Sequence, residues 1–230
     1  MYVFYLPLSL VILFLSKKWL TATIAKLVHR LGGSSHTLIV IWSLIFLPGT
    51  VIHELSHFFL AIITGARTGK IGILPEYLED DWADEAGDKS VALGYVQTQK
   101  LNPLQGFFVG ISPFITGLII LIWLGSLIQS GYLAGNIPLV FLEGYLFFTV
   151  ANSFFPSWSD IKQTLPLVVI FLVVLIVFWI MGIHLLFTPG PQIISLANTV
   201  TTTVLISTFV NATLVGLLSA VIWLTKNHAI

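Results

Sequence analysis

Long apolar runs, separated by short polar breaks, divide the chain into six segments. A helix needs about 20 predominantly apolar residues to cross a bilayer. The runs occupy residues 2–15, 37–63, 104–128, 139–155, 165–187 and 200–224. The first run is short, and residues 16–31 follow it with apolar positions at helical spacing among basic ones, so they extend the first span or lie at the interface. The pattern predicts an all-α polytopic membrane protein with about six transmembrane helices.

One long polar stretch, residues 66–104, interrupts this pattern after the second run. Residues 70–74 and 90–98 have some strand character, and an acidic segment lies between them. We expect a small β-hairpin-like insertion with a charged tip. We interpret the acidic segment as a solvated loop, because runs of like charge usually do no more than solvate. Residues 1–230 then form a single membrane domain that carries this insertion.

Composition supports a lipid environment and narrows the chemistry. The chain is 57% hydrophobic and 9% charged, whereas a soluble domain carries about 25% charged residues. We therefore expect a multi-pass integral membrane protein whose surroundings are the lipid bilayer. The formal net charge is +0, which argues against nucleic-acid binding because that needs a basic excess. There are no cysteines, so any metal must be held by His, Asp or Glu.

The second apolar run contains the sequence His53-Glu54-Leu55-Ser56-His57, an HExxH motif. On a helix, residues four apart lie on one face, so the two imidazoles can bind one ion. Neutral imidazole suits Zn²⁺, and such an ion lowers the pKa of bound water toward about 7. Glu54 would act as the general base. The alternative is that these residues pair with each other and with backbone as structural polar groups.

A catalytic zinc needs a third protein ligand, and Asp160 is the best candidate. It follows Pro156 in a polar segment at the end of the fourth run. Irregular backbone at membrane depth is tolerated where it is buried or lines a watery cavity, which a hydrolase in lipid requires. The alternative is that Asp160 only caps the next helix. Glu143 and His184 are weaker candidates, because both can lie near the interface and reach water.

These two sequence elements resemble the site-2 protease family, the M50 intramembrane zinc metalloproteases. In that family a membrane helix carries HExxH, and a later one carries an Asn-x-x-Pro-x-x-x-x-Asp-Gly-like motif. Asn152 and Asp160 match the second element, whereas Pro156 stands one place later than is commonest and Ile161 replaces the usual glycine. The resemblance covers roughly residues 37–165, the metalloprotease-like core, and residues 165–230 would be additional transmembrane helices.

The resemblance implies that His53, His57 and Asp160 hold Zn²⁺ and that Asn152 binds the substrate backbone near it. It also implies that the substrate is a transmembrane protein or peptide, unwound so that a strand of it pairs with the edge of the inserted sheet. The predicted function is hydrolysis of peptide bonds by zinc-activated water. The alternative is a catalytically silent membrane relative that binds or chaperones membrane proteins, against which the presence of Glu54 argues.

A metal transporter is disfavoured, because transporters place several ligands along a path and here the ionisable residues concentrate at one site. Separately, Gly106-Phe107-Phe108-Val109-Gly110 fits a helix-packing motif and predicts a close helix contact. The distribution of Lys and Arg between loops does not decide the membrane orientation.

Overall fold

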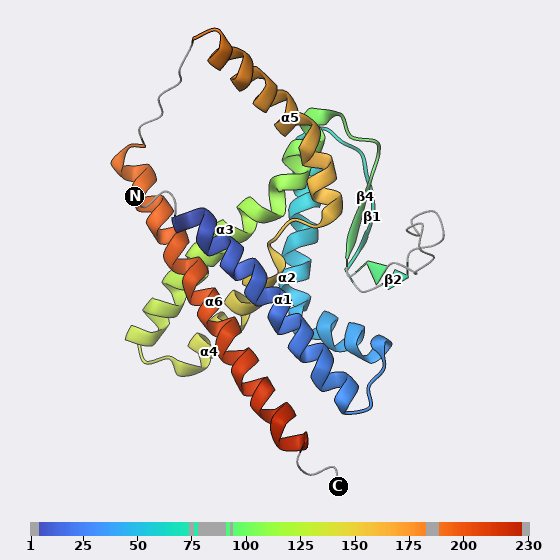
Figure 1. The fold of residues 1–230 in the computed structure, drawn as a ribbon, viewed down its shortest axis with the longest axis vertical. Coiled ribbons are helices and arrows are strands. Elements are labelled where there is room, and N and C mark those ends of the chain that lie inside the picture. Colours follow the sequence, from blue (N-terminus) through green and yellow to red (C-terminus); the bar gives the residue numbers. More distant parts are fainter. Residues whose placement is uncertain (1–4, 74–75, 78–90, 93, 183–188, 227–230) are drawn as a thin grey trace. The chain divides into compact units, whose positions relative to one another are not determined.

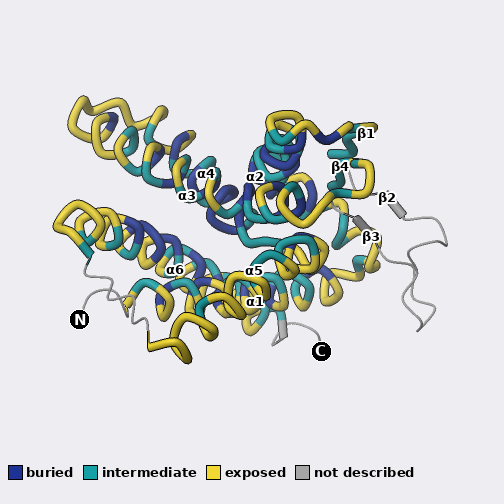
Figure 2. The backbone as a smooth tube through the Cα atoms, turned by 90° about the horizontal axis from the view of Figure 1, so that it is seen from above, coloured by how far each residue is buried: buried dark blue, intermediate teal, exposed yellow. Residues whose placement is uncertain are grey.

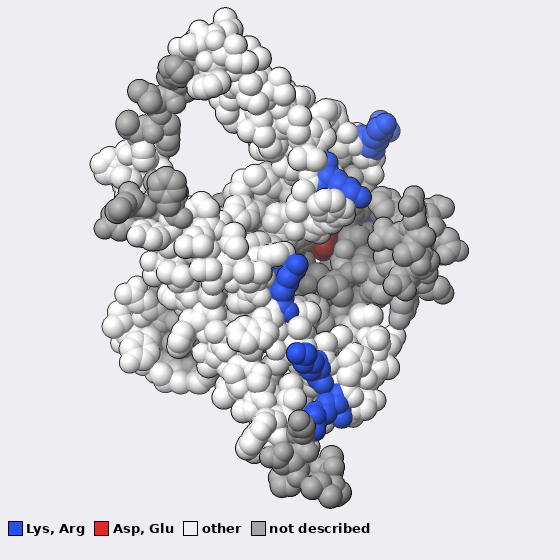
Figure 3. All heavy atoms as spheres, viewed as in Figure 1, with Lys and Arg blue, Asp and Glu red and all other residues white. Residues whose placement is uncertain are grey.

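The computed structural model describes residues 5–73, 76–77, 91–92, 94–182 and 189–226. Within these ranges the chain is mainly helical, as the apolar pattern predicts. The helices are α1 (Tyr5–Arg30), α2 (Ser35–Ile63), α3 (Pro103–Leu133), α4 (Ile137–Ser153), α5 (Trp158–Ile180) and α6 (Pro191–Lys226). All except the 17-residue α4 are long and apolar enough to cross a membrane. Most of the described surface in view in Figure 3 is neither basic nor acidic.

The first and fifth helices extend beyond the apolar runs that predict them. Residues 16–31 do not form a separate interfacial helix, since α1 runs unbroken from Tyr5 to Arg30 and so extends the first run. The fifth helix begins at Trp158, so its predicted start near residue 165 is wrong. The reason is local: Ser157 is the N-cap and Asp160 completes a capping box, the usual signature of a helix start. Pro166 is tolerated further along the helix.

The insertion after the HExxH helix contains two antiparallel strand pairs. Strand β1 (Thr68–Gly72) pairs with β4 (Tyr95–Thr98), and β2 (Glu76–Tyr77) pairs with β3 (Val91–Ala92). A β-hairpin-like insertion was predicted here, and the paired strands agree with it. Most of the predicted acidic segment lies outside the described residues. Helix α2 ends at Ile63, and Gly65 just beyond it has a positive φ of 75°, the left-handed conformation common past a helix end.

The chain forms two compact units, each drawn from separate segments. The first contains Met1–Pro48, Ile120–Asn152 and Pro191–Ile230, and the second contains Gly49–Ile119 and Ser153–Gly190. No observation tests the predicted single domain, which stays a prediction.

In the first unit α1 and α6 pack against each other over much of their length (Figure 1). Two polar contacts join these helices: Asn211 Nδ2 donates to Ser16 Oγ at 3.1 Å, and Arg30 Nε donates to Thr225 Oγ1 at 3.0 Å. Both pairs are separated by 195 residues, so the two helices run parallel. An apolar cluster around Leu20, Phe46 and Val215 fills the core of this unit.

In the second unit the close helix contact predicted for the glycine motif is present. A Cβ added at Gly106 would lie 2.9 Å from the carbonyl oxygen of Gln163, and one at Gly110 would lie 2.6 Å from that of Asp160. Glycine at both positions therefore lets α3 approach the first turns of α5. Beyond that contact α5 is largely exposed (Figure 2), and Asp160 is its one buried residue among those described.

Candidate metal centre

The two histidines of the HExxH motif lie one turn apart on α2, and the Nδ1 atom of each ring is hydrogen-bonded to a backbone carbonyl. His53 Nδ1 donates to the carbonyl oxygen of Ser153 at 2.7 Å, and His57 Nδ1 donates to that of Val109 at 2.8 Å. A carbonyl only accepts, so each Nδ1 carries the proton and each Nε2 keeps a free lone pair in the neutral ring. This is the arrangement that orients metal-binding imidazoles in proteins.

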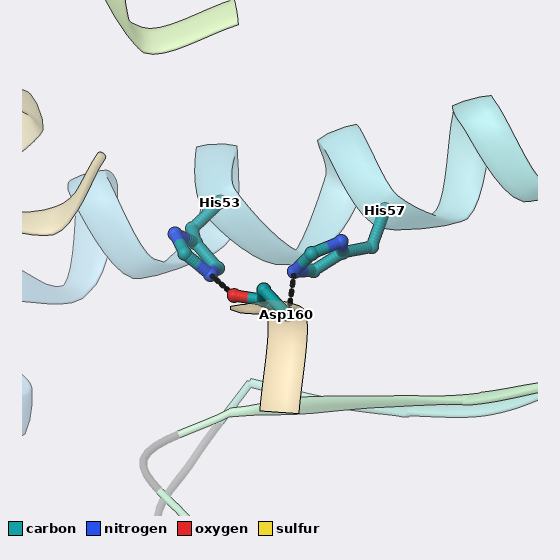
Figure 4. A group of neighbouring side chains, drawn as sticks. All are labelled: His53, His57 and Asp160. Carbon is teal, nitrogen blue, oxygen red and sulfur yellow. Dashed lines mark ion pairs between the residues drawn. The ribbon is translucent and has the colours of Figure 1, made fainter. Parts of the chain in front are cut away.

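Asp160, on α5, faces both imidazoles across the site (Figure 4). His57 Nε2 lies 3.1 Å from Asp160 Oδ1, and His53 Nε2 lies 3.5 Å from Oδ2. The aspartate also caps its helix: the Ser157 backbone N–H donates to Oδ2 at 2.6 Å, and the Asp160 N–H donates to Ser157 Oγ at 3.3 Å. The capping role and the position facing the histidines, which the sequence offered as alternatives, therefore coexist. The cap holds one oxygen of the carboxylate and leaves Oδ1 directed at His57.

The donor types suit a tetrahedral cation, and two of the distances between them are close to the ligand spacing of such an ion. One ligand atom from each of His53, His57 and Asp160 lies within 4.8 Å of the others. With Zn–N and Zn–O bonds of about 2.0–2.2 Å, two ligands of a tetrahedral zinc stand about 3.3–3.5 Å apart. The two measured imidazole–carboxylate distances, 3.1 and 3.5 Å, are close to this separation. Two imidazoles and one carboxylate also leave a fourth position open, as in catalytic zinc sites.

Buried polar groups also contact the backbone carbonyls around the two histidines. Ser112 Oγ donates to the Val109 carbonyl at 2.7 Å, the same carbonyl that accepts from His57. Ser56 Oγ donates to the His53 carbonyl at 2.6 Å and lies 3.3 Å from Ser112 Oγ. The polar atoms around the two imidazoles are therefore paired, and Glu54 beside them is also buried.

Of the three candidate third ligands, the described structure places only Asp160 beside the two histidines. His53, His57 and Asp160 are the one group of three potential metal ligands in the described part of the chain. Glu143 lies in α4 and is buried, not near water as expected, and its Oε2 has no hydrogen-bond partner. His184 lies outside the described residues.

Asn152, predicted to bind substrate, forms a paired contact within the first unit. Its Nδ2 donates to Asn211 Oδ1 at 3.0 Å and also to the Phe148 carbonyl, while its Oδ1 accepts from Asn211 Nδ2 at 2.9 Å. A substrate role for Asn152 stays a prediction. Sequence reasoning missed Asn211, although an asparagine in the middle of an apolar run is the kind of costly residue that predicts a buried partner.

Comparison of the chain with protein-family models, with curated proteins and with solved structures finds no match. The residues and geometry of the site are therefore what indicates a function for this chain.

Proposed function

We propose that this chain is an intramembrane zinc metalloendopeptidase that hydrolyses peptide bonds of membrane-associated substrates. The observation that carries the proposal is the convergence of His53, His57 and Asp160, with both Nδ1 atoms engaged by carbonyls and both Nε2 atoms facing one carboxylate. Such an arrangement is expected of metal ligands. A plain ion pair needs Nε2 of one ring only, whereas here Nε2 of each ring faces an oxygen of the same carboxylate.

The chemistry follows from the residues in the site. Zinc, when bound by the three side chains, would polarise a water molecule and the scissile carbonyl. Glu54 follows His53 directly and interacts electrostatically with His53, His57 and Asp160. Its carboxylate accepts a proton from the attacking water and returns it to the leaving amine. His53 and His57 would hold zinc through Nε2, because Nδ1 of each ring donates to a backbone carbonyl.

The membrane setting narrows the substrate class. Helices α2 and α5, which carry the site, are both long and apolar enough to cross a membrane. A substrate that reaches such a site is a transmembrane protein or peptide, and it must expose its backbone before a peptide bond can be attacked. An edge of the β1–β4 sheet offers main-chain hydrogen bonds to an extended segment.

The experiment compares purified wild-type protein with Glu54→Gln in proteoliposomes. The substrate is a model protein with a single transmembrane helix, made with and without an Asn-Pro pair in the middle of that helix. We expect zinc-dependent cleavage by the wild type, faster with Asn-Pro, and loss of cleavage in Glu54→Gln with zinc still bound. Glu143→Gln is the matched control, because it makes the same change at another buried carboxylate, and it retains cleavage.

Two outcomes contradict the proposal. If the wild-type protein binds no zinc, the three side chains form a structural ion pair. If it binds zinc but the wild type itself does not cleave the substrate, the chain is a catalytically silent relative that binds or chaperones membrane substrates.

A further inference from the structure

The backbone at Gly94 closely approaches the Glu54 side chain. A Cβ added at Gly94 would lie 2.8 Å from Glu54 Cγ, 2.8 Å from Oε1 and 3.0 Å from Cδ. Carbon atoms in ordinary contact stand about 3.5–4.0 Å apart, so a methyl group does not fit at this position. Glu54 is itself 7% exposed, so its side chain lies almost entirely inside the protein.

The strand that follows Gly94 limits how far its backbone can move. Tyr95 begins β4 and pairs with Gly72 in β1, and Val96 pairs with Ile71. The Tyr95 ring also covers Gly72 so closely that a Cβ at Gly72 would collide with it. The pairing of β1 with β4 therefore limits movement of the backbone next to Gly94. Gly94 in turn lies against the Glu54 carboxylate.

We propose that Gly94 is a positioning residue of the hydrolytic site, which keeps the Glu54 carboxylate in the orientation needed for proton transfer. The inference rests on the proposed function, since it assigns a role to Gly94 in the reaction of Glu54. A general base must lie within hydrogen-bond reach of the proton it abstracts, so a side chain that can rotate away is a poor base. The insertion then contributes directly to catalysis at α2, in addition to any role in binding substrate.

The contact itself is tested without an activity measurement. Gly94→Ala lowers the thermal unfolding midpoint of the detergent-solubilised protein by about 3 °C or more, because the methyl group overpacks a filled site. In a Glu54→Ala background the same substitution has no such effect, since alanine lacks Cγ, Cδ and Oε1. Gly69→Ala, in β1 and facing Gln97, is the control, and its effect is the same with either residue at position 54. Equal shifts for Gly94→Ala in both backgrounds would overturn the inference.

The role in the reaction is tested with the proteoliposome assay and a zinc-binding measurement. In Gly94→Ala we expect kcat to fall by about 100-fold, the effect of misplacing a catalytic group by about 1 Å. Zinc affinity remains within about threefold of wild type, because Gly94 contacts Glu54 and not the zinc ligands, whereas loss of a group that holds a ligand costs tenfold or more. Unchanged kcat despite the stability coupling would overturn the positioning role. Absence of cleavage by the wild type itself would reject the proposed function and, with it, the role of Gly94 in the reaction. The unfolding midpoints of Gly94→Ala with Glu54 and with Ala at position 54 would still show whether Gly94 packs against the Glu54 side chain.

Discussion

The side-chain amides of Asn152 and Asn211 exchange two hydrogen bonds, at 3.0 and 2.9 Å. Asn211 is fully buried and also donates to Ser16 Oγ, so this pair links the end of α4 to α6 and α1. Both N–H groups of Asn152 are used, one by Asn211 and the other by the Phe148 carbonyl. A substrate that hydrogen-bonds Asn152 must therefore use the remaining acceptor capacity of Oδ1 or displace Asn211.

Replacing Asn211 with alanine should lower the free energy of unfolding by about 1–3 kcal/mol, because it leaves buried groups of Asn152 without partners. Thermal unfolding in detergent measures the change. Asn198→Ala is the control: it lies on the same helix, is exposed, and should shift stability by less than about 0.5 kcal/mol. Equal effects at the two positions would show that the amide pair contributes no stability of its own.

Alanine at His53, His57 or Asp160 should abolish stoichiometric zinc binding, because each substitution leaves two protein ligands where a stable site needs at least three. Elemental analysis of the purified protein gives the zinc content directly. His36→Ala makes the same substitution on the same helix at an exposed position and should keep the wild-type zinc content. If His36→Ala loses zinc while His57→Ala retains it, the metal is bound elsewhere.

Gly110→Ala should weaken zinc binding by about 10- to 100-fold, the usual cost of disturbing a group behind a metal ligand. The added methyl group would lie 2.6 Å from the Asp160 carbonyl oxygen and so displaces the first turn of α5. Zinc competition with a chelator gives the affinity. Gly125→Ala, in the same helix with nothing near its Cβ, is the matched control and leaves zinc affinity unchanged.

Ser157→Ala should destabilise the start of α5 by about 1 kcal/mol, since it removes the acceptor for the Asp160 N–H. The Ser157 backbone N–H still donates to Asp160 Oδ2, so the hydrogen bond to the carboxylate itself is retained. Hydrogen exchange at residues 158–161 would report the loss as faster exchange there. Ser126→Ala, at an exposed hydroxyl in α3, should leave that exchange unchanged.

The sequence predicts the features that depend on spacing within one element. The i, i+4 histidines, the glycine motif at 106–110 and the apolar runs all correspond to what α2, α3 and the other helices contain. The sequence also identified Asp160 as a candidate ligand, although only the structure places its carboxylate 3.1 Å from His57 Nε2. Gly94 and Asn211 were not predicted, because their roles arise from contacts between segments far apart in the chain. The apolar run placed the start of the fifth span at residue 165, whereas α5 begins at Trp158, because a polar first turn capped by Ser157 precedes the apolar residues.

The parallel course of α1 and α6 constrains how the chain is threaded through a bilayer. If both helices cross it, they cross in the same direction, so the chain between them returns by an odd number of crossings. Helices α2, α3 and α5 supply three, and α4, at 17 residues or about 26 Å, is shorter than the roughly 30 Å hydrocarbon layer. An odd total number of crossings thus favours five passes over the six expected from the apolar runs. The start of α1 and the end of α6 then face opposite compartments.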